Sequence, residues 1–189
     1  MILTRPGILS AISLGHIVVD PYNPELVNTN SVDVRVGQWL YRMRTARYEG
    51  EYMLPGSDPS EMYLGPSPKL PPGSTFSMQP GDKFLILTYE KIGSTRMYVP
   101  VFAGKSTSAR HWLITHQAGG FGDVGYHSHW TMEIENGSNF VQYLTVGERI
   151  GQIAFYKCWP EIEGGYDGAY QDDKREPWEL MLPKPRPRL

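Results

Sequence analysis

Residues that could do chemistry gather in the second half of the chain, beginning with residues 104–110, G-K-S-T-S-A-R. A glycine followed by small hydroxyl residues can turn backbone N–H groups and hydroxyls toward phosphate oxygens, and an arginine adds a planar charged fork. An ordinary Gly/Ser turn with a surface arginine would have the same composition. Alone, this segment is a candidate phosphate site.

Two further segments bring carboxylates. Residues 116–126, H-Q-A-G-G-F-G-D-V-G-Y, are rich in glycine, which lets backbone approach a ligand closely. Residues 131–135, T-M-E-I-E, alternate so that the threonine and both glutamates share one strand face. These polar side chains could simply face solvent. Alternatively, Asp123 and Glu133, ten residues apart across a tight turn, could meet in one pocket.

The elements that must position these residues are short β-strands. Gly (20) and Pro (16) are both abundant, which favours many turns and few long helices. Apolar spacing predicts one short helix over residues 6–15. Residues 49–82 hold seven prolines and predict irregular loops and edge strands. Strands are predicted over residues 17–19, 31–36, 83–89, 97–102, 112–115, 129–135, 140–144 and 150–156, a pattern typical of an all-β barrel or sandwich.

Bulk properties narrow the class of protein. A chain of 189 residues suits one domain, and a net charge of −2 gives no basic field for nucleic-acid binding. The single cysteine, Cys158, excludes an intrachain disulfide and favours a reducing compartment. No run approaches the roughly 20 apolar residues of a membrane span, and the N-terminus lacks a signal-peptide core. We therefore expect a cytoplasmic protein with no membrane partner.

Several motifs together resemble those of the dCTP deaminase and dUTPase superfamily. Residues 104–110 are similar to its G-R-S-S-L-A-R motif, and residues 116–134 resemble its D-x-G-[WFY] turn leading through a strand to L-E. Residues 147–152, G-E-R-I-G-Q, match its G-x-R-I-G-Q turn. Residues 31–37 are similar to its S-x-D-x-R-x-G element, and residues 166–171, Y-D-G-A-Y-Q, resemble its arm, Y-x-G-K-Y-Q.

This resemblance implies a fold and an assembly. The fold would be a dUTPase-like distorted β-barrel or jelly-roll with a short N-terminal helix. Residues 1–189 would form a single domain, with residues 160–189 a mobile C-terminal arm that covers the site. Family members are homotrimers whose active sites lie at subunit interfaces.

The resemblance also implies roles for individual residues. Glu133 would be the general base that activates water for attack at C4 of cytosine, with Ser106 and Arg110 supporting the water, the amine and the phosphates. Asp123 would lie near the ribose 3′-hydroxyl in the pyrophosphate-releasing reaction, and Tyr126 would stack on the deoxyribose. The other implied nucleotide contacts are Lys105, Thr107, Gly119, Gln152, Tyr166 and Tyr170.

The implied activity is hydrolytic deamination of a deoxycytidine nucleotide, dCTP or dCMP, with coupled pyrophosphate release to dUMP left open. Mg²⁺ would enter on the nucleotide phosphates without direct protein ligands. Zinc is not expected, because zinc deaminases need a P-C-x-x-C ligand pair and this chain has one cysteine. Two alternatives stay open: an enzyme that acts only as a dUTPase, and a non-catalytic member that binds nucleotide.

The sequence departs from the family pattern at the arm and beside the base. Ala169 and Asp173 stand where the arm has a lysine and a glutamine, which predicts weaker preference for a triphosphate. Gly122 replaces a branched apolar residue. His127 and His129 share a strand face and could ligate a metal, although polar strand-end histidines are the simpler interpretation.

Overall fold

The computed structural model describes residues 1–52, 57–95, 97–168, 170–171 and 175–183. The chain opens with helix α1 (Arg5–Ser13), which has a proline in its first turn, and strand β1 (Ile17–Asp20) follows. Ile8 and Ala11 bury one face of α1. The predicted short N-terminal helix is confirmed.

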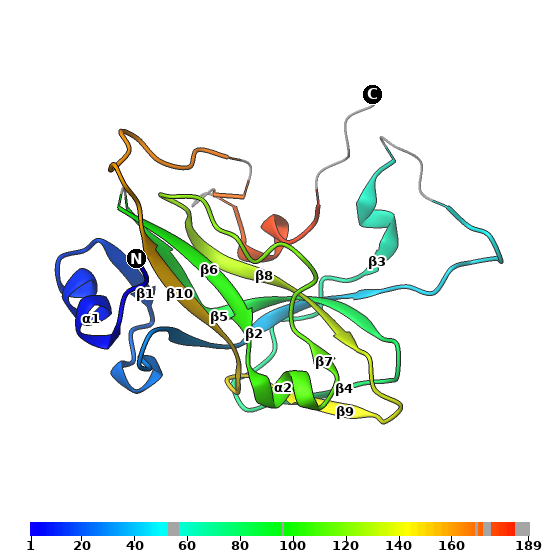
Figure 1. Cartoon of the computed structure of the whole chain (residues 1–189). Helices are drawn as coiled ribbons and strands as arrows, with labels where there is room; N and C mark the ends of the chain where they lie inside the picture. The colour runs from blue at the N-terminus through cyan, green and yellow to red at the C-terminus, as the bar shows by residue number, and fades with distance from the viewer. Residues whose placement is uncertain (53–56, 96, 169, 172–174, 184–189) are drawn as a thin grey trace.

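Antiparallel strands make up most of the remaining structure. The main sheet runs in the order β6-β10-β2-β5-β8-β7, with β1 added to β5 and β3 added to β2, and a second sheet pairs β4 with β9. Figure 1 shows the twisted strands crossing near the centre of the molecule. The predicted mainly β fold is confirmed. The bounds are β2 Val32–Met43, β3 Tyr63–Leu64, β4 Thr75–Met78, β5 Lys83–Ser94, β6 Tyr98–Gly104, β7 Leu113–Ile114, β8 His127–Asn136, β9 Gln142–Thr145 and β10 Arg149–Lys157.

Short helical elements link the strands. Helix α2 spans Ser106–Arg110, and single 3₁₀ turns span η1 (Pro24–Leu26), η2 (Pro59–Met62) and η3 (Pro177–Leu180). The candidate phosphate segment is thus a five-residue helix rather than an open Gly/Ser turn. Among the described residues, no helix is long and apolar enough to span a membrane.

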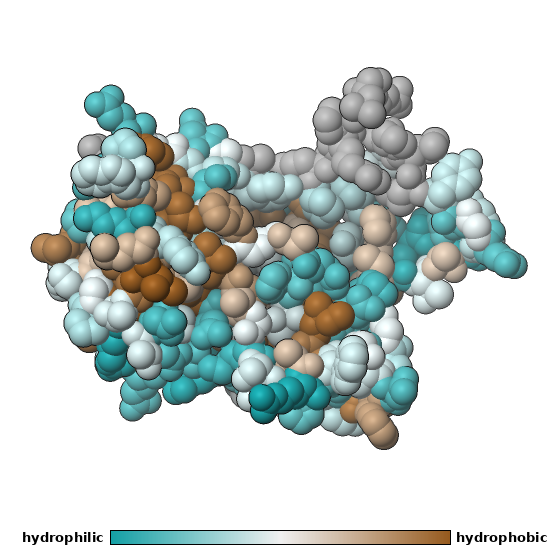
Figure 2. Space-filling view, viewed as in Figure 1, coloured by the Kyte–Doolittle hydropathy of each residue, from teal (hydrophilic) through white to brown (hydrophobic). Residues whose placement is uncertain are grey.

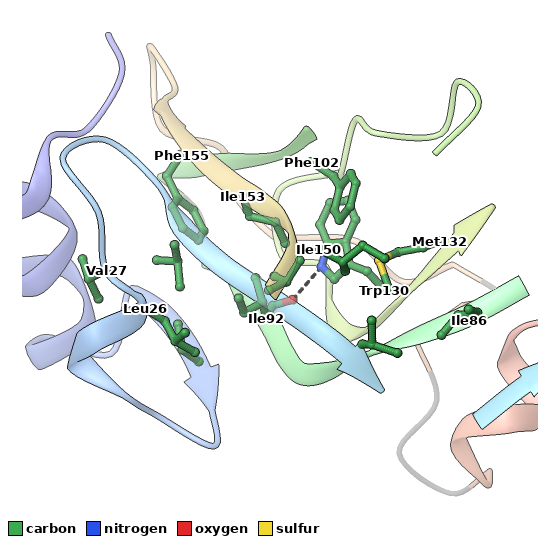
Figure 3. Close-up of a cluster of buried hydrophobic side chains, with 14 of the residues drawn as sticks. Leu26, Val27, Ile86, Ile92, Phe102, Trp130, Met132, Ile150, Ile153 and Phe155 are labelled. Carbon is green, nitrogen blue, oxygen red and sulfur yellow. Dashed lines mark hydrogen bonds between the residues drawn. The ribbon is translucent and has the colours of Figure 1, made fainter. Parts of the chain in front are cut away.

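The core lies between the inward faces of these strands (Figure 3). Phe102 stacks on Trp130, with ring centroids 6.4 Å apart, and the Trp130 indole N–H donates to the carbonyl of Ile92 at 3.0 Å. Buried and partly exposed residues alternate along all of β8. Met132 and Ile134 therefore face the core while Glu133 faces outward, as the period of two predicted.

Strands β2 and β5 are longer than the predicted strands over residues 31–36 and 83–89. The pairing of β5 shifts register between Leu87 and Lys91, and that of β2 shifts between Val36 and Leu40. At each irregularity the bulged strand carries extra residues that do not pair with its neighbour, so the regular pairing is interrupted although the strand continues. Residues 49–82 contain the short strands β3 and β4, consistent with the predicted edge strands.

Hydrophilic side chains dominate the face seen in Figure 2, while apolar ones gather on its left, over α1 and the neighbouring ends of β6 and β10.

Candidate active site

A cavity of about 390 Å³ lies against the outward face of β8. Asp123 from the glycine-rich segment and Glu133 from β8 both line it, so the two carboxylates share one pocket as their spacing indicated. The volume falls in the range of roughly 300–1,000 Å³ that is usual for small-molecule sites. Gly119, Tyr126, Tyr166 and Tyr170, all predicted nucleotide contacts, also line it.

Glu133 is held from one side by the backbone of the glycine-rich segment. Its carboxylate oxygen Oε2 accepts a hydrogen bond from the Gln117 N–H at 3.3 Å. A Cβ built on Gly119 would lie 3.5 Å from Oε1, an ordinary van der Waals distance. Burial and the nearby Glu133 charge raise the pKa of the Tyr63 phenol. The carboxylate keeps acceptor capacity for a ligand in the cavity.

Tyr126 forms an aromatic wall of the cavity. Its ring meets Trp130 edge-on with centroids 5.3 Å apart, and Tyr166 edge-on at 5.4 Å. The Tyr126 hydroxyl donates to the backbone carbonyl of His129 at 3.3 Å. Burial raises the pKa of Tyr126 to about 12, so this ring is neutral at physiological pH. A neutral ring packed between two others presents a fixed apolar surface to a ligand.

Gly122 is required by the bulk of Trp130. A Cβ on Gly122 would lie 2.5 Å from one Trp130 ring carbon and 3.0 Å from Pro100 Cγ. The resemblance implies a branched apolar side chain at this position. In this chain the Trp130 ring occupies the space that such a side chain would need. Gly122 and Trp130 both line the cavity, so their contact forms part of its wall.

The described part of the C-terminal arm lies over the cavity. The Tyr166 N–H donates to the Val124 carbonyl at 2.8 Å, and the Gln171 side chain accepts from the His127 N–H at 2.8 Å. Tyr166 and Tyr170 thereby close one side. Ala169 and Asp173, on which the expected phosphate preference depends, lie outside the described residues. The mobility expected for residues 160–189 stays a prediction.

The remaining predicted site residues do not line this cavity. Ser106, Thr107 and Arg110 lie on the exposed helix α2, which Figure 1 shows at the lower edge of the molecule, apart from η3 and the arm. Arg110 instead borders a surface groove with Trp112. The sequence-predicted constellation is thus split between the cavity and α2.

Lys105 and Gln152 belong to a polar cluster near α2. Lys105 Nζ lies 2.7 Å from Oδ1 of the fully buried Asp33, and Arg149 lies 3.5 Å from the other carboxylate oxygen. Gln152, the cross-strand partner of Asp33, accepts a hydrogen bond from the Ser31 hydroxyl at 2.8 Å. Lys105 is therefore tied to a carboxylate in the single chain, while a second cation stands beside it.

Sequence reasoning missed several cavity residues. His129 and Thr131 share the strand face of Glu133; the alternation places Thr131 on that face and His129 is considered only as a metal ligand, so neither is assigned to the cavity from the sequence. Burial lowers the pKa of His129, whose Nδ1 lies 2.9 Å from the Thr88 carbonyl. Among the described residues, no group of three or more His, Cys, Asp or Glu side chains is placed to hold a metal. Tyr63, Leu180 and Met181 carried no local signal.

The fold and the site define a class: a mainly β domain with a pair of carboxylates in one cavity, walled by aromatic rings and lined in part by residues of the C-terminal segment. The sequence profile of the dCTP deaminase-like family matches residues 2–158. The chain belongs to this family, which confirms the predicted resemblance.

Curated relatives agree with this placement. A "dCTP deaminase, dUMP-forming" of Thermobifida fusca is 32% identical over 168 residues, covering 88% of this chain and 83% of the relative. One of Bifidobacterium adolescentis is 31% identical, covering 89% and 86%. The crystal structure of a 2′-deoxycytidine 5′-triphosphate deaminase from Agrobacterium tumefaciens superposes with a TM-score of 0.60 at 20% identity, covering 82% of this chain and 47% of that one. That superposition supports the fold.

Proposed function

We propose that the protein deaminates dCTP without zinc and releases the product as dUMP. The observation that carries the proposal is the cavity in which Glu133 and Asp123 face the same ligand space. Its relatives of about 30% identity bear names for this reaction. The family resemblance assigns a role in the reaction to each of these carboxylates.

In this proposal Glu133 acts as the proton shuttle. It accepts a proton from water as the water oxygen bonds to C4 of cytosine, and then delivers that proton to the 4-amino group. The C4–N bond breaks to release ammonia, and the remaining water proton ends on N3 of the uracil ring. A second water, oriented by Asp123, would then cleave the bond between the α- and β-phosphates to give dUMP and pyrophosphate.

Mg²⁺ fits this scheme as a partner of the substrate. It keeps several waters and commonly binds through substrate phosphates with one or two carboxylates. Asp123 is an exposed carboxylate in the cavity. The ion would neutralise phosphate charge when the nucleotide binds, while Glu133 and the backbone around Gly119 would orient the cytosine ring. We also propose that the enzyme works on the cytoplasmic nucleotide pool.

The separation of α2 from the cavity supports a homotrimer in which one copy completes the site of its neighbour. Ser106 and Arg110 are exposed, and in the described part of the chain neither lines the cavity that holds Glu133. Beside them, the side chains of Trp112 and Phe140 are 68% and 78% exposed. Contact with a second copy would remove this apolar surface from water, which is favourable. Gln152 near α2 would then approach the neighbour's phosphates, while Lys105, paired with Asp33, would hold the start of the helix that carries Ser106 and Arg110.

Mixing two inactive variants tests this assembly. Glu133→Gln keeps an intact α2, and Arg110→Ala keeps an intact base. Equal mixing after dissociation and reassembly should restore about a quarter of wild-type activity, because random pairing unites one intact half from each chain in that share of sites. Light scattering should report a trimer. A fully active monomer, or a mixture with no recovered activity, would refute shared sites.

The reaction itself is tested by incubation with dCTP, dCMP and dUTP, following ammonia and pyrophosphate separately. We expect both products from dCTP. Pyrophosphate from dUTP without ammonia from any substrate would establish the dUTPase alternative, and binding without either product would establish a non-catalytic member.

A further inference from the structure

Residues 176–183, beyond the arm motif and outside the family match at 2–158, are packed as part of the structure. Trp178 meets Trp39 of β2 with ring centroids 6.5 Å apart. Met181 is only 3% exposed. A capping box between Glu176 and Glu179 holds the 3₁₀ turn η3 in shape. Residues 176–183, the C-terminal segment, therefore pack on the sheet in a defined position.

The sheet surface that the C-terminal segment covers lies beside Glu133. Tyr41 pairs with Leu85, and Leu85 pairs with Glu133, so these three residues form one row across β2, β5 and β8. Directly opposed residues of antiparallel strands share a face. Met181 packs in the cluster of Tyr41 and Leu85, which brings the C-terminal segment to the edge of the row.

Two residues of the C-terminal segment reach the cavity itself. Leu180 and Met181 line it together with Leu85, while their neighbour Leu182 packs in the same cluster without lining it. On the side of β5, Glu133 therefore has the apolar side chains of Leu85, Leu180 and Met181 as neighbours in the cavity wall. On its other side it meets the Gln117 N–H and the backbone at Gly119.

We infer that Leu180 and Met181 form the wall against the C5 edge of the pyrimidine and limit the size of a C5 substituent. This rests on the proposed function, in which Glu133 acts at C4. The ring neighbours of C4 are N3, which needs a hydrogen-bond donor, and C5, which carries only hydrogen. Placing N3 against Leu180 and Met181 would leave a buried acceptor unsatisfied. Placing C5 there satisfies the apolar wall and leaves N3 on the side of the ring away from Leu180 and Met181.

Binding of unreactive nucleotides that differ only at C5 tests this wall. The probes are the α,β-imido analogues of dUTP, dTTP and 5-propynyl-dUTP, measured by calorimetry with Mg²⁺ on wild type, Met181→Ala and the matched control Leu182→Ala. Met181→Ala should raise the affinity for the propynyl analogue relative to the dUTP analogue by about tenfold or more, since one methylene in such a pocket changes discrimination by roughly 10–200-fold. Leu182→Ala should leave this ratio unchanged.

Leu180→Ala is a second lining variant, and circular dichroism checks that each variant is folded. Ratios equal to wild type in both lining variants, or an equal shift in Leu182→Ala, would overturn the wall. Ammonia release from dCTP by wild type tests the proposed function separately. A shifted ratio without deamination would keep the wall and remove the activity. Deamination with an unshifted ratio would do the reverse.

Discussion

Replacing Gly122 by alanine should destabilise the protein because Trp130 occupies the space. The added Cβ would lie 2.5 and 2.9 Å from two Trp130 ring carbons and 3.0 Å from Pro100 Cγ. The ring cannot simply turn away, since its N–H donates to the Ile92 carbonyl and its far side stacks on Phe102. Such overpacking costs about 1–3 kcal/mol.

The assay is thermal unfolding. For a domain of this size about 1 kcal/mol lowers Tm by roughly 2–4 °C, so Gly122→Ala should lose about 2–12 °C. The matched control is Gly119→Ala, three residues earlier, whose Cβ would lie 3.5 Å from Glu133 Oε1 in ordinary contact. That variant should unfold within about 2 °C of wild type, because its contact needs no rearrangement.

A second-site change separates crowding from other causes. Trp130→Leu should cost stability by itself, but adding Gly122→Ala to it should cost far less than in the wild-type background, since the clashing ring is gone. Additive losses in the double variant, or equal losses for Gly119→Ala and Gly122→Ala, would refute the packing argument.

Three other outcomes are expected. Glu133→Gln should lower ammonia release by about 10²–10⁴, with nucleotide binding within a few-fold; retention of more than half the activity would remove Glu133 as the base. Burial lowers the pKa of His129 below 6.5, so as pH falls the unfolded chain takes up a proton on this imidazole before the folded chain does. The free energy of unfolding should therefore fall as pH drops below 6.5. In His129→Gln the urea midpoint should depend less on pH in this range. Because Ala169 and Asp173 lack a charge-assisted phosphate contact worth roughly 1.5–3 kcal/mol, kcat/KM should favour dCTP over dCMP only modestly, and a preference above about a thousandfold would refute this.

Local sequence patterns predicted those parts of the site that depend on local geometry. The period of two placed Glu133 on the outward face of β8 because the strand has no bulge between residues 127 and 136 that would reset it. The glycine-rich segment is predicted to let backbone approach a ligand closely, and in the structure Gly119 and Gly122 of this segment line the cavity. The same reasoning underestimated β2 and β5, where register shifts interrupt the alternation.

The C-terminal wall could not be predicted in this way. Met181 lies 140 residues along the chain from Tyr41 and 87 to 98 residues from β5 (Lys83–Ser94), and its burial comes from packing on that sheet face. Nothing in the spacing of residues 176–183 indicates which surface they cover. A polar, glycine-rich stretch is expected to be a mobile arm, which stays a prediction, and in the structure Trp178, Met181 and Leu182 of this stretch pack in a hydrophobic cluster.

The division of the motifs between cavity and α2 has one physical reason. The Lys105 ammonium neutralises the buried Asp33 carboxylate, and this ion pair fixes the start of α2 against β2 and β10. Fixed there, Ser106 and Arg110 cannot turn to the cavity of their own chain without breaking that pair and leaving Asp33 with less compensation. These residues are thus held away from Glu133 of their own chain, which supports the proposal that a neighbouring copy presents them. In the proposed trimer, weakening the Lys105–Asp33 pair should impair the neighbour's site before it impairs the fold of its own cavity.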